Sequence, residues 1–414
     1  MNLSFEEIVS SNLCKLKNKN ILVAFSGGKD SLALLDFLNC QKDYITFNLY
    51  ACHVNHGLRD DAHIDEDFCR RFCNNLGIPF KSVNIGNILN GNITAGIEDA
   101  ARRHRYNALI NVSRDFNCHY ILTAHTFDDQ IESFFTDLYT GASIFTLGGI
   151  AYENNKILRI MLDAKTYHIE DYLKRRNLLP IFDKSNNDTR FFRNRVRHNI
   201  LPNLYKAGTD FVPTVLRLQK DSARINEYFY NTTCKAIISD KPHIVEIDKD
   251  IFTAFAHIEQ EYLLGRIFTG RFRFTRSAIT EALKLCQRKG SKRINLANEY
   301  CFEVSYSKIR LFKKFFLNAF FVEKEAGIDT INACGFKIKF CDKLAAMKLT
   351  VRNRQAGDRI SDGKKLKDVF IDKKLDLFER DTAIVVAVGS DILWSEHLEI
   401  NNEYLVFERV VYEG

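Results

Sequence analysis

The sequence predicts an α/β protein in which a doubly wound, mostly parallel sheet is followed by a helical domain and a small α+β domain. In the first 150 residues, short apolar runs that suit strands alternate with helical patterns, as in parallel sheets covered by helices on both faces. From about residue 333 the pattern changes to short β-branched and aromatic runs, which is typical of a separate domain with strands. A chain of 414 residues is long enough for two or three domains.

The first part contains expected strands that are each followed by an expected helix. The strands are expected at Ile21–Phe25, Phe47–Val54, Phe80–Ile85 and Tyr120–Thr123. The helices are expected at Leu32–Leu38, Asp65–Leu76, Gly96–Asp115 and from the residues after Thr123 to about Leu138. Residues 163–204 look helical and basic, and they complete a first domain over residues 1–204. Ligands of such sheets bind beyond the carboxyl ends of the strands, so polar residues that directly follow a strand are the candidate site.

The rest of the chain divides into two expected domains. Residues 205–332 read as mainly helical, with glycines as punctuation at Gly265, Gly270 and Gly290. Residues 333–414 read as a small α+β domain, with strands expected at Phe336–Phe340, Leu349–Arg352, Ile384–Val388 and Tyr404–Val411.

The composition excludes several broad classes of protein. Hydrophobic residues make up 46% and charged residues 27% of the chain, which excludes a wholly disordered or fibrous protein. No apolar run approaches the length of a membrane span, and the N-terminus carries Glu6 and Glu7 instead of a secretion signal. The 11 cysteines are odd in number, irregularly spaced and without a Cys-x-x-Cys pair, which favours reduced, buried thiols. We expect a soluble cytoplasmic protein that has no membrane partner.

A positive charge excess lies in the middle of the chain. The net charge is 59 − 52 = +7. Residues 1–204 contain 24 basic and 23 acidic side chains, residues 205–334 contain 21 and 15, and residues 335–414 contain 14 and 14. This excess indicates a polyanionic partner, and a generically basic surface explains it equally well.

The most specific motif lies between the first expected strand and helix. It reads Ser26-Gly27-Gly28-Lys29-Asp30-Ser31. Its glycines let the backbone approach a ligand and the start of the following helix directs free N–H groups at that ligand, which together make a phosphate cradle. The spacing differs from that of a Walker A loop. A carboxylate inside such a cradle suits Mg²⁺ binding or the orientation of a reacting group. The structural alternative is a glycine-rich turn that only caps the helix.

Two more polar clusters follow expected strands. The run from His53 to Arg59 ends the second strand and brings His53 and Asn55 to the same edge as the loop, although a buried structural histidine is the commoner role. The second cluster, from Thr123 to Ser133, contains His125.

The cluster from Thr123 to Ser133 also contains three carboxylates. Asp129 and Glu132 are three residues apart and so are neighbours on one helix face, which suits a metal ion or an ammonium group. A solvated helix face is the alternative for this pair. Asp128 stands at the helix start, where a capping residue is expected.

Two clusters are rich in arginine. Glu98, Arg102 and Arg105 have the spacing of one helix face, where an arginine pair can hold a phosphate or a carboxylate. The second cluster begins with Asp183-Lys184-Ser185-Asn186 and continues with Arg193, Arg195, Arg197 and His198, which together can grip a phosphate backbone. A charged, solvated helix face is the alternative for both clusters.

The hexapeptide Ser26–Ser31 resembles the pyrophosphatase loop, or PP-loop, of N-type ATP pyrophosphatases, which split ATP between the α and β phosphates. The five clusters in their order along the chain resemble the tRNA(Ile)-lysidine synthetase family. The C-terminal runs Val351–Arg359, Lys364–Asp368 and Ile392–Trp394 also resemble that family. The chain departs from the family's pattern at Gly141–Gly149 and at Arg159–Leu162.

The resemblance implies a ligase that joins free lysine to C2 of the wobble cytidine in the isoleucine tRNA with a CAU anticodon. ATP and Mg²⁺ would be used, an adenylated cytidine would be the intermediate, and AMP and pyrophosphate would be released. It implies catalytic roles for Asp30, Asp129, Glu132 and Arg105, with the metal at Asp30. It implies ATP binding by Ser26, Gly27, Gly28, Lys29, Asp30, Ser31, His53, Asn55 and His125. It implies tRNA binding by Arg193, Arg195, Arg197, Arg352 and Arg359.

Three alternatives belong to other functional classes. A PP-loop tRNA thiolation enzyme of the 2-thiocytidine type is the nearest, but such enzymes commonly use Cys-x-x-Cys pairs, which this chain lacks. A small-molecule amidating synthetase would need a source of ammonia, and nothing in the C-terminal half resembles a glutaminase. A non-enzymatic RNA-binding protein would explain the charge but would leave Asp30, Asp129 and Glu132 without a role. The sequence leaves open whether the chain forms a homodimer.

Overall fold

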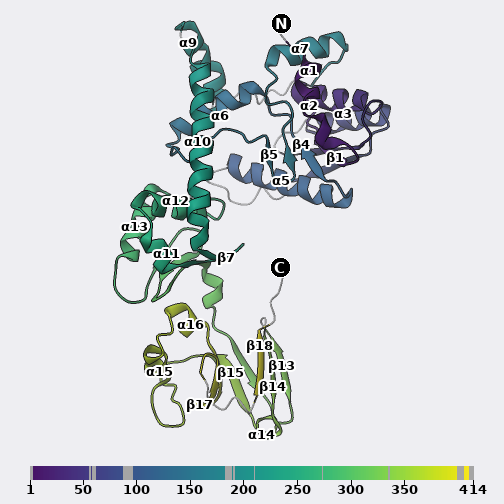
Figure 1. The fold of residues 1–414 in the computed structure, drawn as a ribbon. Helices are drawn as coiled ribbons and strands as arrows, with labels where there is room; N and C mark the ends of the chain where they lie inside the picture. The colour runs from purple at the N-terminus through teal and green to yellow at the C-terminus, as the bar shows by residue number, and fades with distance from the viewer. Residues whose placement is uncertain are drawn as a thin grey trace. The chain divides into compact units, whose positions relative to one another are not determined.

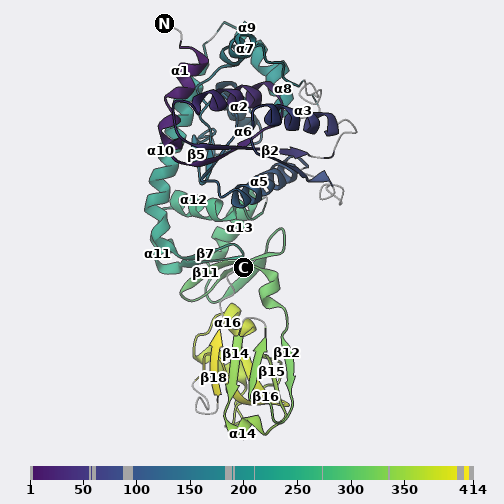
Figure 2. The same cartoon turned by 90° about the vertical axis from the view of Figure 1, so that its right-hand side faces the viewer.

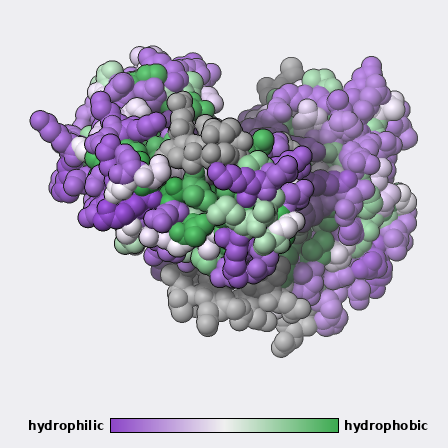
Figure 3. Space-filling model, turned by 90° about the horizontal axis from the view of Figure 1, so that it is seen from below, coloured by the Kyte–Doolittle hydropathy of each residue, from purple (hydrophilic) through white to green (hydrophobic). Residues whose placement is uncertain are grey.

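A computed structural model describes residues 3–55, 57, 62–86, 97–181, 189, 192–208, 210–272, 274–333, 336–398 and 405–409. The chain divides into two compact units, Met1–Asn226 and Glu227–Gly414, and each is described by itself. Among the described helices, none combines the length and the apolar composition that crossing a bilayer requires. On the side shown in Figure 3 the surface is mostly hydrophilic, and apolar residues occur there in small groups.

The first unit is built on a six-stranded sheet with the strand order β3-β2-β1-β4-β6-β5. Its strands are β1 (Asn20–Ala24), β2 (Asn48–Asn55), β3 (Phe80–Asn84), β4 (Tyr120–Leu122), β5 (Glu153–Asn154) and β6 (Ile157–Leu158). All neighbouring pairs from β3 to β6 are parallel, and β5 is antiparallel to β6. The doubly wound, mostly parallel sheet is therefore confirmed. The strand order reverses beside β1, so a crevice is expected at the carboxyl end of this strand.

Helices cover both faces of this sheet. In Figure 2, α2 (Lys29–Gln41) and α3 (Ala62–Asn75) lie on one side of the strands and α5 (Ile97–Asp115) lies on the other. Successive residues of β1 serve the two faces in turn, because side chains alternate along a strand. Ile21 and Val23 belong to the larger apolar core with α2, whereas Leu22 packs in a second core with the α5 residue Leu109.

The other helices of the first unit carry two of the polar clusters. They are α1 (Phe5–Ser10), α6 (Phe127–Tyr139), α7 (Thr166–Arg175), α8 (Phe192–Arg195), the π-helix η3 (Val196–Ile200), α9 (Leu201–Lys206) and the first part of α10 (Val212–Thr233), whose last residues belong to the second unit. Each strand and helix expected in residues 1–150 is present, with ends that differ by a few residues.

The start of the second unit contains helices, as predicted, and also an antiparallel sheet that we did not expect. The helices are α11 (Lys249–Ala254), α12 (His257–Phe268) and α13 (Arg276–Cys286). The sheet has the order β7-β8-β11-β10-β9, with β7 (Ile237–Lys241), β8 (Ile244–Asp248), β9 (Lys292–Asn295), β10 (Tyr300–Val304) and β11 (Lys308–Lys313). The strands β10 and β11 lack a clear apolar pattern because each carries a buried charge. Glu303 and Arg310 are neighbours across these two strands, and each is less than 3% exposed. The prediction of a mainly helical segment needs this correction.

The end of the chain forms two small antiparallel sheets. One has the order β12-β15-β16-β17 and the other the order β13-β14-β18, whose strands lie side by side in Figure 1. The strands are β12 (Phe321–Lys324), β13 (Thr330–Ala333), β14 (Phe336–Phe340), β15 (Leu349–Asn353), β16 (Ile384–Val388), β17 (Asp391–Ser395) and β18 (Leu405–Arg409). Short helices α14 (Asp342–Ala345), α15 (Leu366–Asp372) and α16 (Leu377–Thr382) accompany them. The four strands expected here are present, and β12 and β13 begin before the expected boundary at residue 333.

Candidate active site

The loop Ser26–Ser31 connects β1 to the start of α2, at the point where the strand order reverses. Gly27 has φ +81°, and a Cβ atom there would lie 2.6 Å from Ile181 Cδ1. Gly27 also accepts a hydrogen bond from the backbone N–H of Ile181 at 3.0 Å. Only glycine meets both the positive φ and the close approach without strain. Gly28 is the N-cap of α2, so the free N–H groups of the helix start follow directly.

The two loop hydroxyls brace the loop itself. Ser26 Oγ and Ser31 Oγ are 3.0 Å apart, and the Ser31 hydroxyl donates to Gly28 O at 3.1 Å. The backbone N–H of Ser26 donates to Ser31 Oγ at 3.2 Å. Both hydroxyls therefore shape the cradle in addition to the phosphate contacts that the sequence predicts for them.

Asp30 presents a buried carboxylate oxygen to this cradle. Its Oδ1 atom receives no hydrogen bond from any described residue and lies 3.2 Å from Lys29 Nζ. Burial raises the pKa of Asp30, Lys29 opposes the rise, Asp129 adds to it and Arg197 opposes it. The Lys29 ammonium is the cation at this oxygen in the structure, and a metal ion bound there would take its place.

Asp129 and Glu132 lie on α6 and face two arginines from α8 and η3. Arg193 donates to Asp129 Oδ1 at 2.6 Å and to Glu132 Oε2 at 3.2 Å. Arg197 holds Glu132 in a bidentate pair, with Nε and Nη2 at 2.5 and 2.7 Å from the two carboxylate oxygens. The fourth and fifth sequence clusters therefore form one ion-pair cluster, which we call the carboxylate–arginine cluster and which consists of Asp129, Glu132, Arg193 and Arg197.

The two carboxylates of this cluster differ in exposure and in partners. The Glu132 side chain is 4% exposed and that of Asp129 is 17% exposed. Asp129 Oδ2 also accepts from the N–H and the hydroxyl of Thr126, the N-cap of α6, at 2.8 and 3.0 Å. Burial raises the pKa of Asp129, but Arg193, His125 and these Thr126 hydrogen bonds more than offset it, and the pKa lies below its usual range. Asp129 is therefore a stable anion and the more accessible of the two carboxylates.

The arginines of this region have three different environments. Arg193 and Arg197 are spaced as neighbours on one helical face, and the hydrogen bond to Glu132 raises the pKa of Arg197. Arg195, between them, points elsewhere: it is exposed and its guanidinium lies 5.1 Å from the centre of the Phe192 ring. Of the three arginines in this region that are predicted to bind tRNA, two thus bind carboxylates in this structure. The preceding residues Asp183–Asn186 lie outside the described part of the chain.

The prediction that Asp128 caps its own helix is wrong, because Thr126 is the N-cap of α6 and Asp128 instead contacts the start of α7. Its Oδ2 atom accepts from the N–H and the hydroxyl of Thr166 at 2.8 and 2.7 Å, at the start of α7. Lys29 Nζ donates to the same Thr166 hydroxyl at 3.4 Å. Thr166 therefore joins the PP-loop to the start of α6. The sequence does not indicate this residue, because Thr166 stands in no polar cluster and lies 137 residues from Lys29.

His53 contacts Phe25, the residue before the PP-loop, and Asn55 contacts the turn after β2. His53 is 6% exposed, and its Nδ1 lies 3.1 Å from Phe25 O and 3.5 Å from Cys69 Sγ. Burial lowers the pKa of His53, so the ring is neutral at neutral pH. Asn55 Oδ1 accepts from the Gly57 N–H at 2.8 Å. The structural role that the sequence left open for His53 fits this geometry, and Asn55 holds the turn at Gly57. His56, Leu58 and Arg59 lie outside the described residues.

Burial has the same effect on the pKa of His125 and of Arg105. The Nδ1 atom of His125 lies 2.9 Å from Thr123 Oγ1, and burial lowers the pKa of His125 to about 3. Burial also lowers the pKa of Arg105, whose guanidinium lies 5.6 Å from the centre of the Tyr106 ring. Arg102 lies over the same ring at 5.2 Å. The side chain of Glu98 lies outside the described part of the structure.

Of the two C-terminal arginines predicted to bind tRNA, one is buried in an ion pair and the other is exposed. Arg352 is 3% exposed and forms a bidentate pair with Asp358 at 2.9 and 2.8 Å. It also donates to the carbonyls of Asn353 and Gly389 at 3.1 and 2.9 Å. These contacts occupy the Arg352 guanidinium, and its contact with tRNA stays a prediction. Arg359 is exposed and donates to Gly363 O at 2.7 Å.

Cysteine chemistry near the loop is disfavoured. Burial raises the pKa of Cys52 and Cys73 to about 12, and it also raises the pKa of Cys69, whose sulfur adjoins Gly27. The thiolate is the reactive form, so these thiols are inert at neutral pH. In the described part of the chain no three His, Cys, Asp or Glu side chains are grouped as a ligand set for a metal. A metal here would be held by Asp30 together with substrate phosphates, as Mg²⁺ commonly is.

Comparisons with known proteins identify the family. Residues 1–204 match the profile of the PP-loop domain. The tRNA(Ile)-lysidine synthase of Thermosipho africanus is 27% identical over 418 residues, which cover 97% of this chain and 93% of that protein. The tRNA(Ile)-lysidine synthase of Borrelia garinii subsp. bavariensis is 30% identical over 308 residues, which cover 72% of this chain and 69% of that protein. Among solved structures, the U34-tRNA thiolase NcsA from Methanococcus maripaludis with its 4Fe–4S cluster aligns with a TM-score of 0.45, at 21% identity over 54% of this chain and 79% of that one. The chain therefore belongs to the tRNA(Ile)-lysidine synthase family and carries a PP-loop domain at residues 1–204.

Proposed function

We propose that the chain joins free lysine to C2 of the wobble cytidine in the isoleucine tRNA with a CAU anticodon. ATP first adenylates the C2 carbonyl oxygen and pyrophosphate is released. The ε-amine of lysine then attacks C2, and AMP leaves as the C–N bond forms. One observation carries the proposal: Thr166 contacts both Lys29 of the PP-loop and Asp128 at the start of α6, so the loop adjoins the helix that carries Asp129 and Glu132.

The loop supplies the binding site for the ATP phosphates. The N–H groups at the start of α2 and the Lys29 ammonium provide positive charge there, and Gly27 gives the backbone its close approach. Mg²⁺ would replace the Lys29 ammonium at the buried Asp30 Oδ1 atom and would neutralise phosphate charge. Arg105 lies near enough to Arg193 for their charges to interact, so it is placed to balance the nucleotide.

We assign different roles to the two carboxylates of the carboxylate–arginine cluster. Glu132 is nearly buried and engages both arginines, so we assign it to positioning them. Asp129 is more exposed and shares its outer oxygen only with arginine, so we assign it to the lysine ammonium group. For lysine to reach Asp129, Arg193 must turn away, and the negative charge of the nucleotide offers it another partner. Bound lysine and nucleotide would then lie on neighbouring groups of one cluster, as the second half-reaction requires.

Recognition of the tRNA requires more than this site. A methionine tRNA with the same CAU anticodon presents the same wobble base, so base contacts there cannot discriminate the two tRNAs. Arg195 and Arg359 are exposed and remain candidates for phosphate contacts. The excess of 21 basic over 15 acidic side chains in residues 205–334 supports a wider contact.

The direct test measures both half-reactions. The purified chain is incubated with labelled ATP, magnesium and an unmodified CAU isoleucine tRNA transcript, and ATP–pyrophosphate exchange is measured with and without the tRNA. Lysine is then added, and the nucleosides of the digested tRNA are analysed by mass spectrometry. We expect exchange that depends on the tRNA, and a cytidine that gains the mass of lysine less water. Exchange without tRNA, or sulfur in place of lysine, would contradict the proposal.

A further inference from the structure

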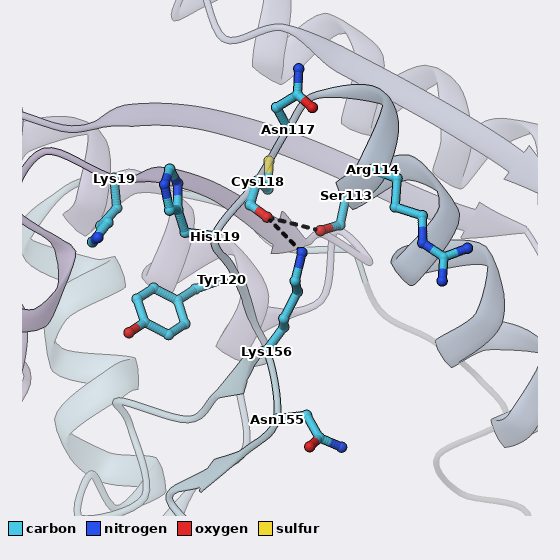
Figure 4. Close-up of a pocket in the computed structure, with 9 residues that line it drawn as sticks. All are labelled: Lys19, Ser113, Arg114, Asn117, Cys118, His119, Tyr120, Asn155 and Lys156. Atoms are coloured by element: carbon cyan, nitrogen blue, oxygen red, sulfur yellow. Dashed lines mark hydrogen bonds between the residues drawn. The ribbon is translucent and has the colours of Figure 1, made fainter. Parts of the chain in front are cut away.

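The first unit has a cationic hollow at the edge of the sheet opposite to the PP-loop. It has a volume of about 480 Å³ and lies where β1 and β4 begin, between the end of α5 and the turn before β6 (Figure 4). The PP-loop follows the other end of β1, a strand of five residues that spans about 16 Å at about 3.3 Å per residue. The hollow is therefore separate from the carboxylate–arginine cluster, and neither half-reaction uses it.

The lining of this hollow carries positive charge without a carboxylate. Lys19, Arg114 and Lys156 line it, and Figure 4 shows Lys156 between the other two. None of the nine lining residues is acidic. Arg114 stands in the last turn of α5, where the helix dipole offsets part of its charge, whereas Lys19 and Lys156 lie outside helices.

Neighbouring carboxylates do not neutralise these cations. Asp115 is paired with Lys81 at 2.6 Å, and Glu153 is paired with Lys15 at 2.5 Å. Both lysines stand outside the lining of the hollow. Within the described residues, Lys156 Nζ donates to Cys118 O at 3.4 Å, a long hydrogen bond to a neutral group. The positive charge of the hollow is thus available to an anion.

Neutral groups of the hollow add donors and a ring. His119 Nδ1 accepts the backbone N–H of Asn20 at 3.0 Å, which leaves the proton of the neutral ring on Nε2 as a donor. Asn117 and Asn155 contribute side-chain amides, and Tyr120 contributes an aromatic face. Cations, amide donors and an aromatic ring together suit a nucleotide, with its phosphate on the cations and its base or sugar against the ring.

We propose that this hollow is a second contact for the tRNA, in which Lys19 and Lys156 hold one or two backbone phosphates. The inference rests on the proposed function, which brings a tRNA to this chain. A tRNA extends far beyond the span of β1, so a molecule whose anticodon occupies the crevice at one edge can pass the other edge. A contact of this kind adds affinity that is independent of base sequence and sensitive to salt.

The test compares two double variants of equal charge. Lys19→Gln with Lys156→Gln removes two positive charges from the hollow, and Lys42→Gln with Lys174→Gln removes two elsewhere in the first unit. The tRNA dissociation constant is measured by filter binding between about 50 and 300 mM salt. For the hollow variant we expect weaker binding and a log–log salt slope that is smaller by roughly 0.7 to 1.8, at about 0.7 to 0.9 for each of one or two phosphate contacts. The control variant should keep the slope of the unaltered chain, and Lys19→Arg with Lys156→Arg should restore it.

Other outcomes would overturn this assignment. An unchanged slope in the hollow variant, with melting temperature and exchange rate at saturating tRNA also unchanged, would show that tRNA does not contact the hollow. Loss of AMP binding in the variant, measured by calorimetry, with an unchanged tRNA slope would assign the hollow to a free nucleotide. The binding assay does not require product formation. If the unaltered chain forms no lysidine in the tRNA, the proposed function is refuted. The salt slope of tRNA binding tests separately whether tRNA contacts the hollow.

Discussion

Replacing Glu132 by Gln should mainly lower stability, although Glu132 belongs to the candidate active site. The carboxylate accepts hydrogen bonds at 2.5 and 2.7 Å from Arg197 and at 3.2 Å from Arg193. Breaking a buried ion pair by removing one partner costs about 3–5 kcal/mol. The arginines are 33% and 38% exposed, so water screens their charge and we reduce the expected cost to about 2 kcal/mol.

The same isosteric change at Asp129 serves as the matched control. Asp129→Asn keeps an oxygen that accepts the hydrogen bond from the Thr126 N–H but removes the ion pair with Arg193. We therefore expect the free energy of unfolding to fall by about 1 kcal/mol. For a unit of this size, each kcal/mol shifts the melting temperature by roughly 2–4 °C. The expected falls are therefore about 4–8 °C for Glu132→Gln and about 2–4 °C for Asp129→Asn.

In catalysis we expect the larger loss from Asp129→Asn, the variant with the smaller loss of stability. With labelled ATP and tRNA but no lysine, Asp129→Asn should accumulate adenylated tRNA, and a lysine chase should convert it roughly 100-fold more slowly or worse. Adenylate formation should be close to normal because the PP-loop is intact. Loss of adenylate formation in this variant, with recovery at high magnesium, would instead assign Asp129 to the metal. A larger thermal shift for Asp129→Asn than for Glu132→Gln would refute the division of roles.

Three further predictions concern the loop and its surroundings. Asp30→Ala should abolish tRNA-dependent ATP–pyrophosphate exchange while Lys29→Ala reduces it mildly, and equal losses would show that Lys29 is the main phosphate ligand. Gly27→Ala should also impair exchange, because its Cβ would meet Ile181 Cδ1 at 2.6 Å and φ is +81°; an Ile181→Ala second change should recover only part of the loss, and full recovery would exclude backbone strain. The folded chain keeps His125 neutral down to about pH 3, whereas the unfolded chain takes up a proton below about pH 6.5, so stability should fall as the pH falls through this window. His125→Asn should flatten that fall in melting temperature, and an unchanged profile would assign the acid sensitivity to other groups.

The fold of the first unit could be predicted because hydrophobic pattern and punctuation agree there. The run Ile21–Phe25 and the glycines after it mark both the strand β1 and the turn that follows. The antiparallel sheet of the second unit escaped prediction because its charged residues are buried. Arg293 and Arg310 pair with Glu303 and with Asp376 or Asp381 of the chain's end, and such long-range pairs leave no local pattern.

The candidate site was predictable residue by residue but not as a set of partners. Motif order identified Asp129, Glu132, Arg193 and Arg197, yet nothing in their spacing indicates that they bind one another across 61 to 65 residues. Arg352 shows the same limit, since an arginine in a basic run reads as a phosphate contact until its partner Asp358 is seen. Sequence patterns report local periodicity, whereas ion pairs depend on which elements the fold brings together.

The charge balance of the site indicates the order in which its substrates bind. Asp30, Asp129 and Glu132 supply three negative charges, and Lys29, Arg193 and Arg197 supply three positive charges at contact distances. Because Asp129 already has a cationic partner, free lysine must compete with Arg193 for it. ATP and the adenylate bring negative charge that can draw Arg193 away, after which Asp129 keeps only the longer contact with Arg197 at 3.9 Å. The affinity for lysine should then rise once the nucleotide is bound. We therefore expect adenylation to precede lysine binding, so that the amine binds next to a cytidine that is already activated.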